Sequence, residues 1–284
     1  METPITTPSA QIISYGARVL VAMPWQKSVS PITATCLAQL IDRRRCASAL
    51  HFGDAFVAHT RNSIGDIFLK SNCEWMLTID DDMVVPFGDP NWFKFYTGFQ
   101  FPDKFMSFNA LDRLMSHKKT LVGALYFGRN PNGPPVYNEG ANAEEAAHAR
   151  RGPHDVCKPT RWVGTGCMLV HRSVFESIEV RFPTLSRANN SGHGQWFTST
   201  EASLLSRVEQ IKNQLQASLS PEGAYAALES LTNALAVARA ENALGNGEDV
   251  SFCLRAAASG HQPHVDMGLI CGHLGTFCYG PRTF

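Results

Sequence analysis

An apolar, strand-like run that is interrupted by three consecutive aspartates constrains this sequence more than any other feature. In WMLTIDDDMVV, residues 75–85, the acids Asp80, Asp81 and Asp82 stand between two apolar segments. Neighbouring carboxylates repel one another, so they need a cation, a cationic partner or full exposure to water. The apolar flanks argue against simple exposure. The sequence therefore predicts that a buried strand ends here at a charged site.

Apolar segments typical of buried strands alternate with amphipathic segments typical of helices along most of the chain. Strands are expected at 17–25, 75–80, 120–127 and within 162–171, with a short one near residue 50. Helices are expected at 31–41 and 58–69 and at the end of the segment 162–178. This alternation predicts an α/β domain with a largely parallel core sheet. Ligands of such sheets gather at the carboxyl ends of the strands, where the three aspartates stand.

The composition changes between residues 198 and 244, which are rich in Ala, Leu, Glu, Gln and Ser. Leu204 and Val208 recur at helical spacing, and Ser-Pro-Glu at 220–222 fits the start of a second helix. We therefore expect 198–244 to form a helical hairpin that is inserted into one domain spanning 1–284.

The charge balance gives no overall attraction to polyanions. Lys and Arg together number 25, and Asp and Glu together also number 25. Any contact with nucleic acid or a membrane would therefore need a local basic patch. Basic clusters occur at 43–45, 118–119 and 150–151, although such runs are often solvated helix faces. The N-terminus lacks the pattern of a signal peptide, and no apolar stretch is long enough to cross a bilayer. We expect a cytoplasmic protein without membrane contact.

The sequence contains eight cysteines, none in a C-x-x-C pair, and several lie in apolar runs. This pattern indicates buried free thiols rather than disulfides or a zinc site.

The aspartates suit a hard divalent cation. Alternate side chains of an extended backbone share a face, so Asp80 and Asp82 can converge on one ion while Asp81 points elsewhere. Mg²⁺ and Mn²⁺ take oxygen ligands and commonly join carboxylates to the phosphates of a substrate. An acidic turn that is neutralised by Lys or Arg partners is the alternative.

Two later segments add chemistry-bearing residues. Glu248 and Asp249 follow a Gly-rich loop and open a helix, where carboxylates also act simply as helix-stabilising residues. His273 stands near two glycines after an apolar run, which favours a close approach of backbone to a ligand, or else a hydrogen-bonded core histidine.

In this order the segments resemble the GT-A nucleotide-sugar glycosyltransferases, specifically the small single-domain relatives of bacteria and phages. The resemblance covers roughly 17–182 and 245–276 and rests on the segments VAMPW, HTRNSI, IDDDM, VGALYFGR, VGTGCMLVHRSVF, GED and CGHLG. It implies a GT-A (Rossmann-like) fold, with a mainly parallel central sheet flanked by helices. The hairpin at 198–244 has no counterpart in the common core, which leaves acceptor binding or assembly as its role.

The resemblance also implies a metal site and a donor. Asp80 and Asp82 would hold Mn²⁺ or Mg²⁺ on the diphosphate of a nucleoside-diphosphate sugar, a UDP-sugar by preference. His273 would complete the metal shell, and Asp81 would lie near the ribose or the donor sugar. The host cytoplasm is the expected location if a phage encodes the protein.

The donor pocket is implied by three further segments. Arg61 and Asn62 would contact the donor, although a surface ion pair explains the arginine equally well. Trp25 would form a wall for the nucleotide base, with core packing as the alternative. At the turn formed by Gly164, Thr165 and Gly166, the backbone would approach the sugar and the acceptor. A tight turn explains these glycines equally well.

The acidic motif would supply the catalytic carboxylate, Glu248 or Asp249. Attack of a hydroxyl on the anomeric carbon needs a base to accept its proton. In inverting relatives the aspartate has this role, so we favour Asp249. If configuration is retained, Asp249 would orient the acceptor instead.

Three other functions compete with glycosyl transfer. A sugar nucleotidylyltransferase should carry a Gly-rich basic loop after the first strand, and VAMPWQKSVSP has no glycine. A two-metal phosphodiester nuclease should have a basic groove. A non-catalytic module built on the hairpin would leave the acids and His273 unexplained. Some phage relatives glycosylate hydroxymethylated pyrimidines in DNA, so modified DNA is one acceptor hypothesis beside saccharide, lipid and protein.

Overall fold

The computed structural model describes most of the chain outside the N-terminus and the Ala- and Leu-rich segment. The described residues are 18–25, 28–41, 46–52, 57–97, 109–129, 135–137, 156–198, 213, 222–225, 247–275 and 278–279. The expected hairpin at 198–244 therefore lies almost entirely outside the described residues, as do the basic clusters at 43–45 and 150–151. The single domain over 1–284 stays a prediction.

A seven-stranded mixed sheet forms the centre of the fold. Its strands run in the order β2 (Cys46–Phe52), β1 (Val19–Trp25), β3 (Trp75–Ile79), β7 (Cys167–His171), β5 (Leu121–Leu125), β8 (His264–Ile270) and β6 (Cys157–Pro159). Strand β1 is parallel to β2 and β3, and β5 is parallel to β8. Strand β7 pairs antiparallel with both of its neighbours, β3 and β5. The edge strand β6 pairs antiparallel with β8.

The predicted α/β architecture is confirmed, and the sheet is mixed: β2, β1, β3, β5 and β8 run in one direction, whereas β7 and β6 run in the opposite direction. Strand β7 enters the sheet between β3 and β5 in the opposite direction to both. Its apolar run gave no sign of direction, because strands that are buried on both faces look alike in parallel and antiparallel pairings.

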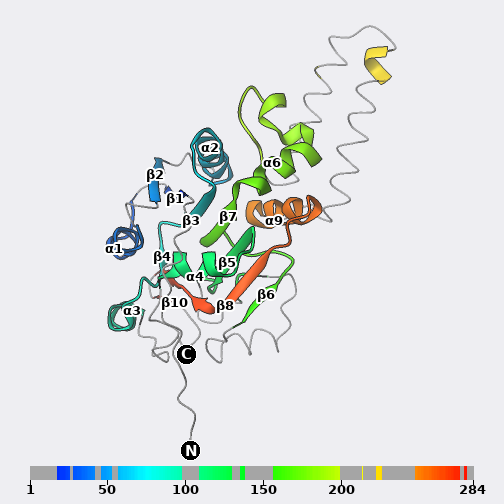
Figure 1. Cartoon of the computed structure of the whole chain (residues 1–284). Helices are drawn as coiled ribbons and strands as arrows, with labels where there is room; N and C mark the ends of the chain where they lie inside the picture. Colours follow the sequence, from blue (N-terminus) through cyan, green and yellow to red (C-terminus); the bar gives the residue numbers. More distant parts are fainter. Residues whose placement is uncertain are drawn as a thin grey trace, which may run out of the picture.

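Helices cover both faces of this sheet (Figure 1). One face carries α2 (Val57–Lys70), α6 (Arg172–Arg181) and α9 (Glu248–Ala258), and the other carries α1 (Pro31–Leu40) and α4 (Ala110–Ser116). Two short 3₁₀ helices follow α6, at Pro183–Leu185 and Arg187–Asn189. Helix α1 begins where the sequence suggests, since Ser30 accepts a hydrogen bond from the N–H of Ile32 and Pro31 occupies the first turn.

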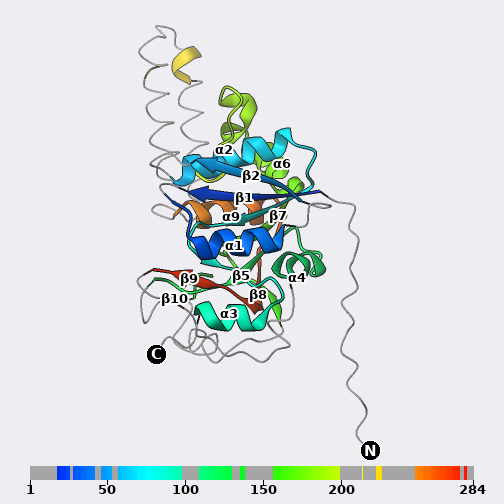
Figure 2. The same ribbon diagram turned by 90° about the vertical axis from the view of Figure 1, so that its left-hand side faces the viewer.

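A second, three-stranded sheet was not expected from the sequence. It consists of β10 (Cys278–Tyr279), β9 (Gly272–Leu274) and β4 (Met83–Val84), all antiparallel. Figure 2 shows β9 and β10 between α1 and α3 (Pro90–Thr97). Strands of two or three residues carry too little periodicity to be recognised in sequence. This small sheet matters because it places the segment after Asp82 against His273.

The core lies on both sides of the central sheet. Beneath α2, α6 and α9 it contains an aromatic cluster, in which Phe175 contacts Trp196, Phe197 and Phe252. A methyl group on Gly65 of α2 would lie 2.8 Å from the ring of Trp196, so the glycine allows this helix to pack closely. The cluster packs against α2 and α9, the helices that carry the charged groups described below.

The six cysteines whose side chains are described are free, as predicted, and five of them are buried. Among the described residues, no helix combines the length and the apolar character that crossing a membrane would require.

Candidate functional site

A cleft of about 460 Å³ opens at the carboxyl ends of β1 and β3. This position agrees with the general tendency of α/β sheets to bind ligands beyond their strand ends. Trp25 closes β1, and Asp80 to Asp82 follow β3. The N-terminal part of α2 contributes Arg61, and the first turn of α9 contributes Glu248. The cleft thus unites segments that are far apart in the sequence, and its volume suits a small-molecule ligand.

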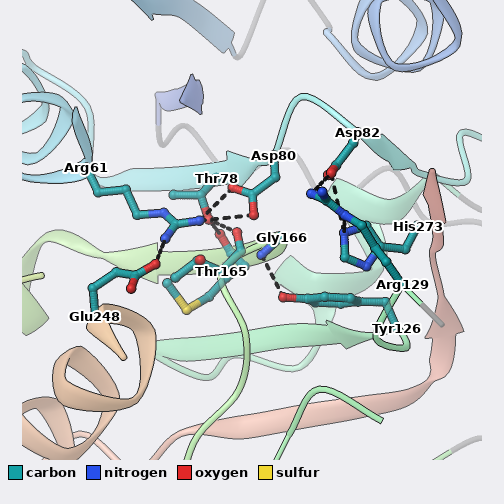
Figure 3. Close-up of polar contacts among 11 residues, drawn as sticks. Arg61, Thr78, Asp80, Asp82, Tyr126, Arg129, Thr165, Gly166, Glu248 and His273 are labelled. Atoms are coloured by element: carbon teal, nitrogen blue, oxygen red, sulfur yellow. Dashed lines mark hydrogen bonds and ion pairs between the residues drawn. The ribbon is translucent and has the colours of Figure 1, made fainter. Parts of the chain in front are cut away.

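The buried cation of the cleft is Arg61, which bridges two carboxylates (Figure 3). One terminal nitrogen lies 2.9 and 3.0 Å from the two oxygens of Asp80, and the other lies 2.5 Å from Glu248. Only 5% of Arg61 is exposed. Burial by itself lowers the pKa of this guanidinium, but the charges of Asp80 and Glu248 outweigh burial and raise the pKa above its ordinary value. Arg61 is therefore a fixed positive charge.

A second set of polar contacts lies on the other side of Asp80 and consists of Asp82, His273 and Arg129 (Figure 3). Pairing of β4 with β9 sets Met83 opposite His273, which leaves the preceding Asp82 3.5 Å from the Nε2 atom of His273. Arg129 donates one hydrogen bond to Asp82 and another, of 2.9 Å, to His273 Nε2. One guanidinium therefore bridges the acid and the imidazole.

The tautomer of His273 follows from its contacts. Its Nδ1 atom lies 2.9 Å from the carbonyl oxygen of Phe127, which can only accept, so Nδ1 carries the hydrogen and Nε2 has a lone pair. Burial lowers the pKa of His273 below its ordinary value, and the charge of Arg129 lowers it further, against the effect of the hydrogen bond to Phe127. The imidazole is therefore held neutral with Nε2 directed at Asp82.

These groups fit a hard divalent cation. The Oδ1 atom of Asp82 is buried and has no hydrogen-bond partner among the described residues, although a carboxylate oxygen is a strong acceptor. A carboxylate and a neutral imidazole are a donor set that suits Mn²⁺. Within the described ranges no three acid, histidine or cysteine side chains gather into a complete metal site. Phosphate oxygens and water would therefore have to supply the remaining ligands, as is common for such ions.

The three expected metal ligands are thus divided. The structure brings Asp82 and His273 together, but both oxygens of Asp80 face Arg61. The physical reason is the buried guanidinium, which requires a nearby anion because an unpaired charge at that depth is costly.

Asp249 stands in the first turn of α9 beside Glu248, which lines the cleft, and is itself partly buried. Its carboxylate accepts a hydrogen bond of 2.8 Å from the N–H of Val250. Burial raises its pKa above the ordinary value of 3.8, and the charge of Glu248 raises it further, although Arg61 opposes both. The neighbouring Glu248 is instead bound to Arg61. Of the two acids, Asp249 is the one that is not held by Arg61 through a salt bridge among the described contacts, and a raised pKa makes its carboxylate a stronger base than an ordinary aspartate.

The structure does not bring Asn62 to the cleft. Its side-chain oxygen accepts a hydrogen bond of 2.8 Å from the backbone N–H of Phe197, and its side-chain nitrogen donates one of 3.1 Å to the hydroxyl of Thr198. Asn62 therefore links α2 to Phe197 and Thr198 by hydrogen bonds.

The glycine turn packs behind the cleft as well. A methyl group on Gly164 would lie 2.0 Å from the hydroxyl of Tyr126, and the N–H of Gly166 donates to that hydroxyl at 3.1 Å. The carbonyl of Gly166 accepts from the N–H of Asp80, and the carbonyl of Thr165 accepts from the buried Thr78 hydroxyl. The turn supports Asp80 and Tyr126 rather than lining the cleft.

Trp25 and Asp81 do line the cleft, as do residues that the sequence analysis did not single out. They include Thr60 in HTRNSI and Arg129 in VGALYFGR, two segments that the resemblance covered only as wholes, together with Pro24, Ser28 and Val57. An arginine shortly after a strand is too common a feature to predict a site, so no local signal marks Arg129.

No protein-family model matches this sequence, and a search of curated proteins finds no match. Among solved structures, the chain is similar to A197 from STIV, with a TM-score of 0.46 and 12% sequence identity. That alignment covers 91% of this chain and 86% of A197. The function proposed below rests on the geometry of the cleft.

Replacing Arg61 by methionine should lower the free energy of unfolding by roughly 3 kcal/mol, because Asp80 and Glu248 would lose their shared counter-ion. Denaturant titration measures this loss. Arg181→Met, at the exposed end of α6, is the matched control and should change stability by less than about 0.5 kcal/mol. Equal effects of the two substitutions would show that Arg61 does not stabilise the acids.

Proposed function

We propose that this protein is a metal-dependent glycosyltransferase of the GT-A type, which moves a sugar from a nucleoside-diphosphate sugar to an acceptor hydroxyl. The observation that carries the proposal is the approach of Asp82 to within 3.5 Å of an unprotonated His273 Nε2 beside a cleft that Trp25 lines. The chemistry of this pair suits a divalent cation that binds together with phosphates.

In this proposal Asp82 and His273 would hold Mn²⁺ or Mg²⁺, and a UDP-sugar would bind beside them in the cleft. When bound, the ion would stabilise negative charge on the departing nucleoside diphosphate. Asp80 orients Arg61 through both of its carboxylate oxygens. Arg61 contributes positive potential at the base of the cleft, because two carboxylates already occupy its terminal nitrogens.

The remaining cleft residues would bind the nucleoside and the sugar. Trp25 offers an aromatic face for the base, and stacking of this kind is typical of nucleotide pockets. Asp81 offers carboxylate oxygens to hydroxyl groups of the ribose or the donor sugar. Both side chains line the same cleft as the metal-binding acid.

Asp249 is the proposed general base. A carboxylate whose pKa is raised is a stronger base than an ordinary one, so it accepts the proton of the acceptor hydroxyl more readily. Glu248 is less suited to this role because Arg61 already binds its carboxylate, at 2.5 Å.

A product assay separates this proposal from other metal-dependent reactions at phosphates. Glycosyl transfer or donor hydrolysis releases UDP, nucleotidyl transfer releases pyrophosphate, and a nuclease shortens DNA. The acceptors to compare are duplex DNA with hydroxymethylated pyrimidines, plain duplex DNA and saccharides. A panel of UDP-sugars with Mn²⁺ that yields no UDP would contradict the proposal.

Asp82→Asn should reduce transfer at least about 100-fold while the fold stays intact, because the amide preserves shape but binds cations poorly. UDP release from the donor measures the rate, and circular dichroism checks the fold. The control is Glu176→Gln, a matching neutralisation on the exposed surface of α6, which should retain full activity. Unchanged turnover in Asp82→Asn would refute the metal role.

Asp249→Asn should slow transfer roughly 100- to 10,000-fold and leave donor affinity unchanged, because general bases typically contribute this much. The base works deprotonated, so the wild-type rate should fall as the pH falls through the pKa of Asp249. That pKa lies above 3.8, so the decline should begin at a higher pH than for an ordinary aspartate. The variant should lack this decline. If donor binding fell as much as turnover, Asp249 would belong to the donor pocket.

A further inference from the structure

Two arginines pair with Asp80, Glu248 and Asp82 of the cleft, and the two arginines differ sharply in burial. The side chain of Arg61 is 6% exposed, whereas that of Arg129 is 57% exposed. Arg61 is enclosed between α2 and α9 and meets two carboxylates. Arg129 reaches Asp82 and His273 from the solvent side, just after β5. Only Arg129 could leave its partners without exposing the core or stranding a buried charge.

We infer that Arg129 is a built-in substitute for the metal ion, which holds Asp82 and His273 until a divalent cation arrives with a nucleoside diphosphate, and then turns onto the phosphates. The inference rests on the proposed function, since it concerns the same ion and the same class of ligand.

The first argument is competition for one lone pair. Arg129 Nε donates to His273 Nε2 at 2.9 Å, and a neutral imidazole nitrogen has a single lone pair. Because Nδ1 is committed to the Phe127 carbonyl, a cation must use this same Nε2 atom. Arginine and metal therefore cannot occupy His273 together.

The second argument concerns the charge of Asp82. Arg129 donates to the Oδ2 atom, while the buried Oδ1 atom has no hydrogen-bond partner among the described residues. A single guanidinium thus leaves the carboxylate incompletely satisfied. A divalent ion brings twice the charge and can meet Asp82 and His273 across their separation of 3.5 Å.

The third argument is where Arg129 would go. It lines the same cleft as Trp25 and Arg61, so phosphates that bind there lie beside it. A guanidinium forms paired hydrogen bonds with phosphate oxygens as readily as with a carboxylate. Since Arg61 is already bound to Asp80 and Glu248, Arg129 is the arginine of this cleft that can exchange partners.

The arrangement predicts coupling between the two ligands. A cation that binds alone must break the hydrogen bonds of Arg129 to Asp82 and His273, and Arg129 gains no new partner. The cation alone should therefore bind weakly. A bound diphosphate would offer the displaced Arg129 new hydrogen-bond acceptors. Each ligand should therefore raise the affinity of the other by the same factor.

Titration of the full-length protein with Mn²⁺, followed by the electron paramagnetic resonance of free Mn²⁺ with and without UDP, tests the inference. Without UDP, Arg129→Ala should bind Mn²⁺ about three- to tenfold more tightly than wild type, an amount set by loss of a partly exposed charged contact. With UDP this advantage should disappear, and UDP itself should bind more weakly to the variant. Arg129→Gln should behave alike and guards against a folding defect in one variant.

Arg181→Ala removes the same charge from the exposed end of α6 and should leave every affinity unchanged. Equal or weaker Mn²⁺ binding by both Arg129 variants without UDP would overturn the role of Arg129 and leave the metal site standing. If no variant and no wild-type protein binds Mn²⁺ even with UDP, the metal site itself is refuted, and with it the inference.

Discussion

The buried guanidinium of Arg61 is the interaction on which the cleft depends. It joins three elements that meet nowhere in the sequence, since it extends from α2 to Asp80 after β3 and to Glu248 at the start of α9. A charge at this depth is stable only with close counter-charges, so it fixes the positions of both acids. The aromatic cluster joins α6 to α9 through Phe175 and Phe252, and Gly65 lets α2 pack against Trp196 of the same cluster.

This arrangement explains how three adjacent aspartates are tolerated at the end of an apolar strand. The first and the third aspartate are neutralised by two different arginines rather than by one shared cation. Asp80 turns to the permanent charge of Arg61, whereas Asp82 turns to the exposed Arg129 beside His273. The first pairing belongs to the architecture. The second is one that a metal ion and a phosphate ligand could replace, and this difference between the two arginines underlies the proposed mechanism.

Local sequence patterns predicted the elements that carry the site but not the contacts between them. The strand at Trp75–Ile79, the helix at Val57–Lys70 and the capped start of α1 followed from hydrophobic period and end residues. Alternation along an extended chain also suggested that Asp80 and Asp82 share a face. The structure separates them, because the chain turns after β3 and long-range partners decide where each carboxylate points.

The parts that sequence did not predict depend on pairings between distant segments. The antiparallel entry of β7 and the short β4–β9 ladder have no local signature, yet the ladder brings His273 to Asp82. The roles of Asn62 and of the turn at 164–166 were ambiguous for the same reason. A polar side chain in a recognised motif can face a ligand or fasten a neighbouring loop, and only tertiary contacts distinguish the two.

Anomalous X-ray scattering from crystals that contain Mn²⁺ and UDP would test the central claim most directly. The account predicts one manganese peak within bonding distance of an Asp82 oxygen and His273 Nε2, with the Arg129 side chain moved onto the UDP phosphates and Arg61 still on Asp80 and Glu248. A manganese peak bound to Asp80 and Glu248, or Arg129 unmoved beside an ion at another position, would contradict it.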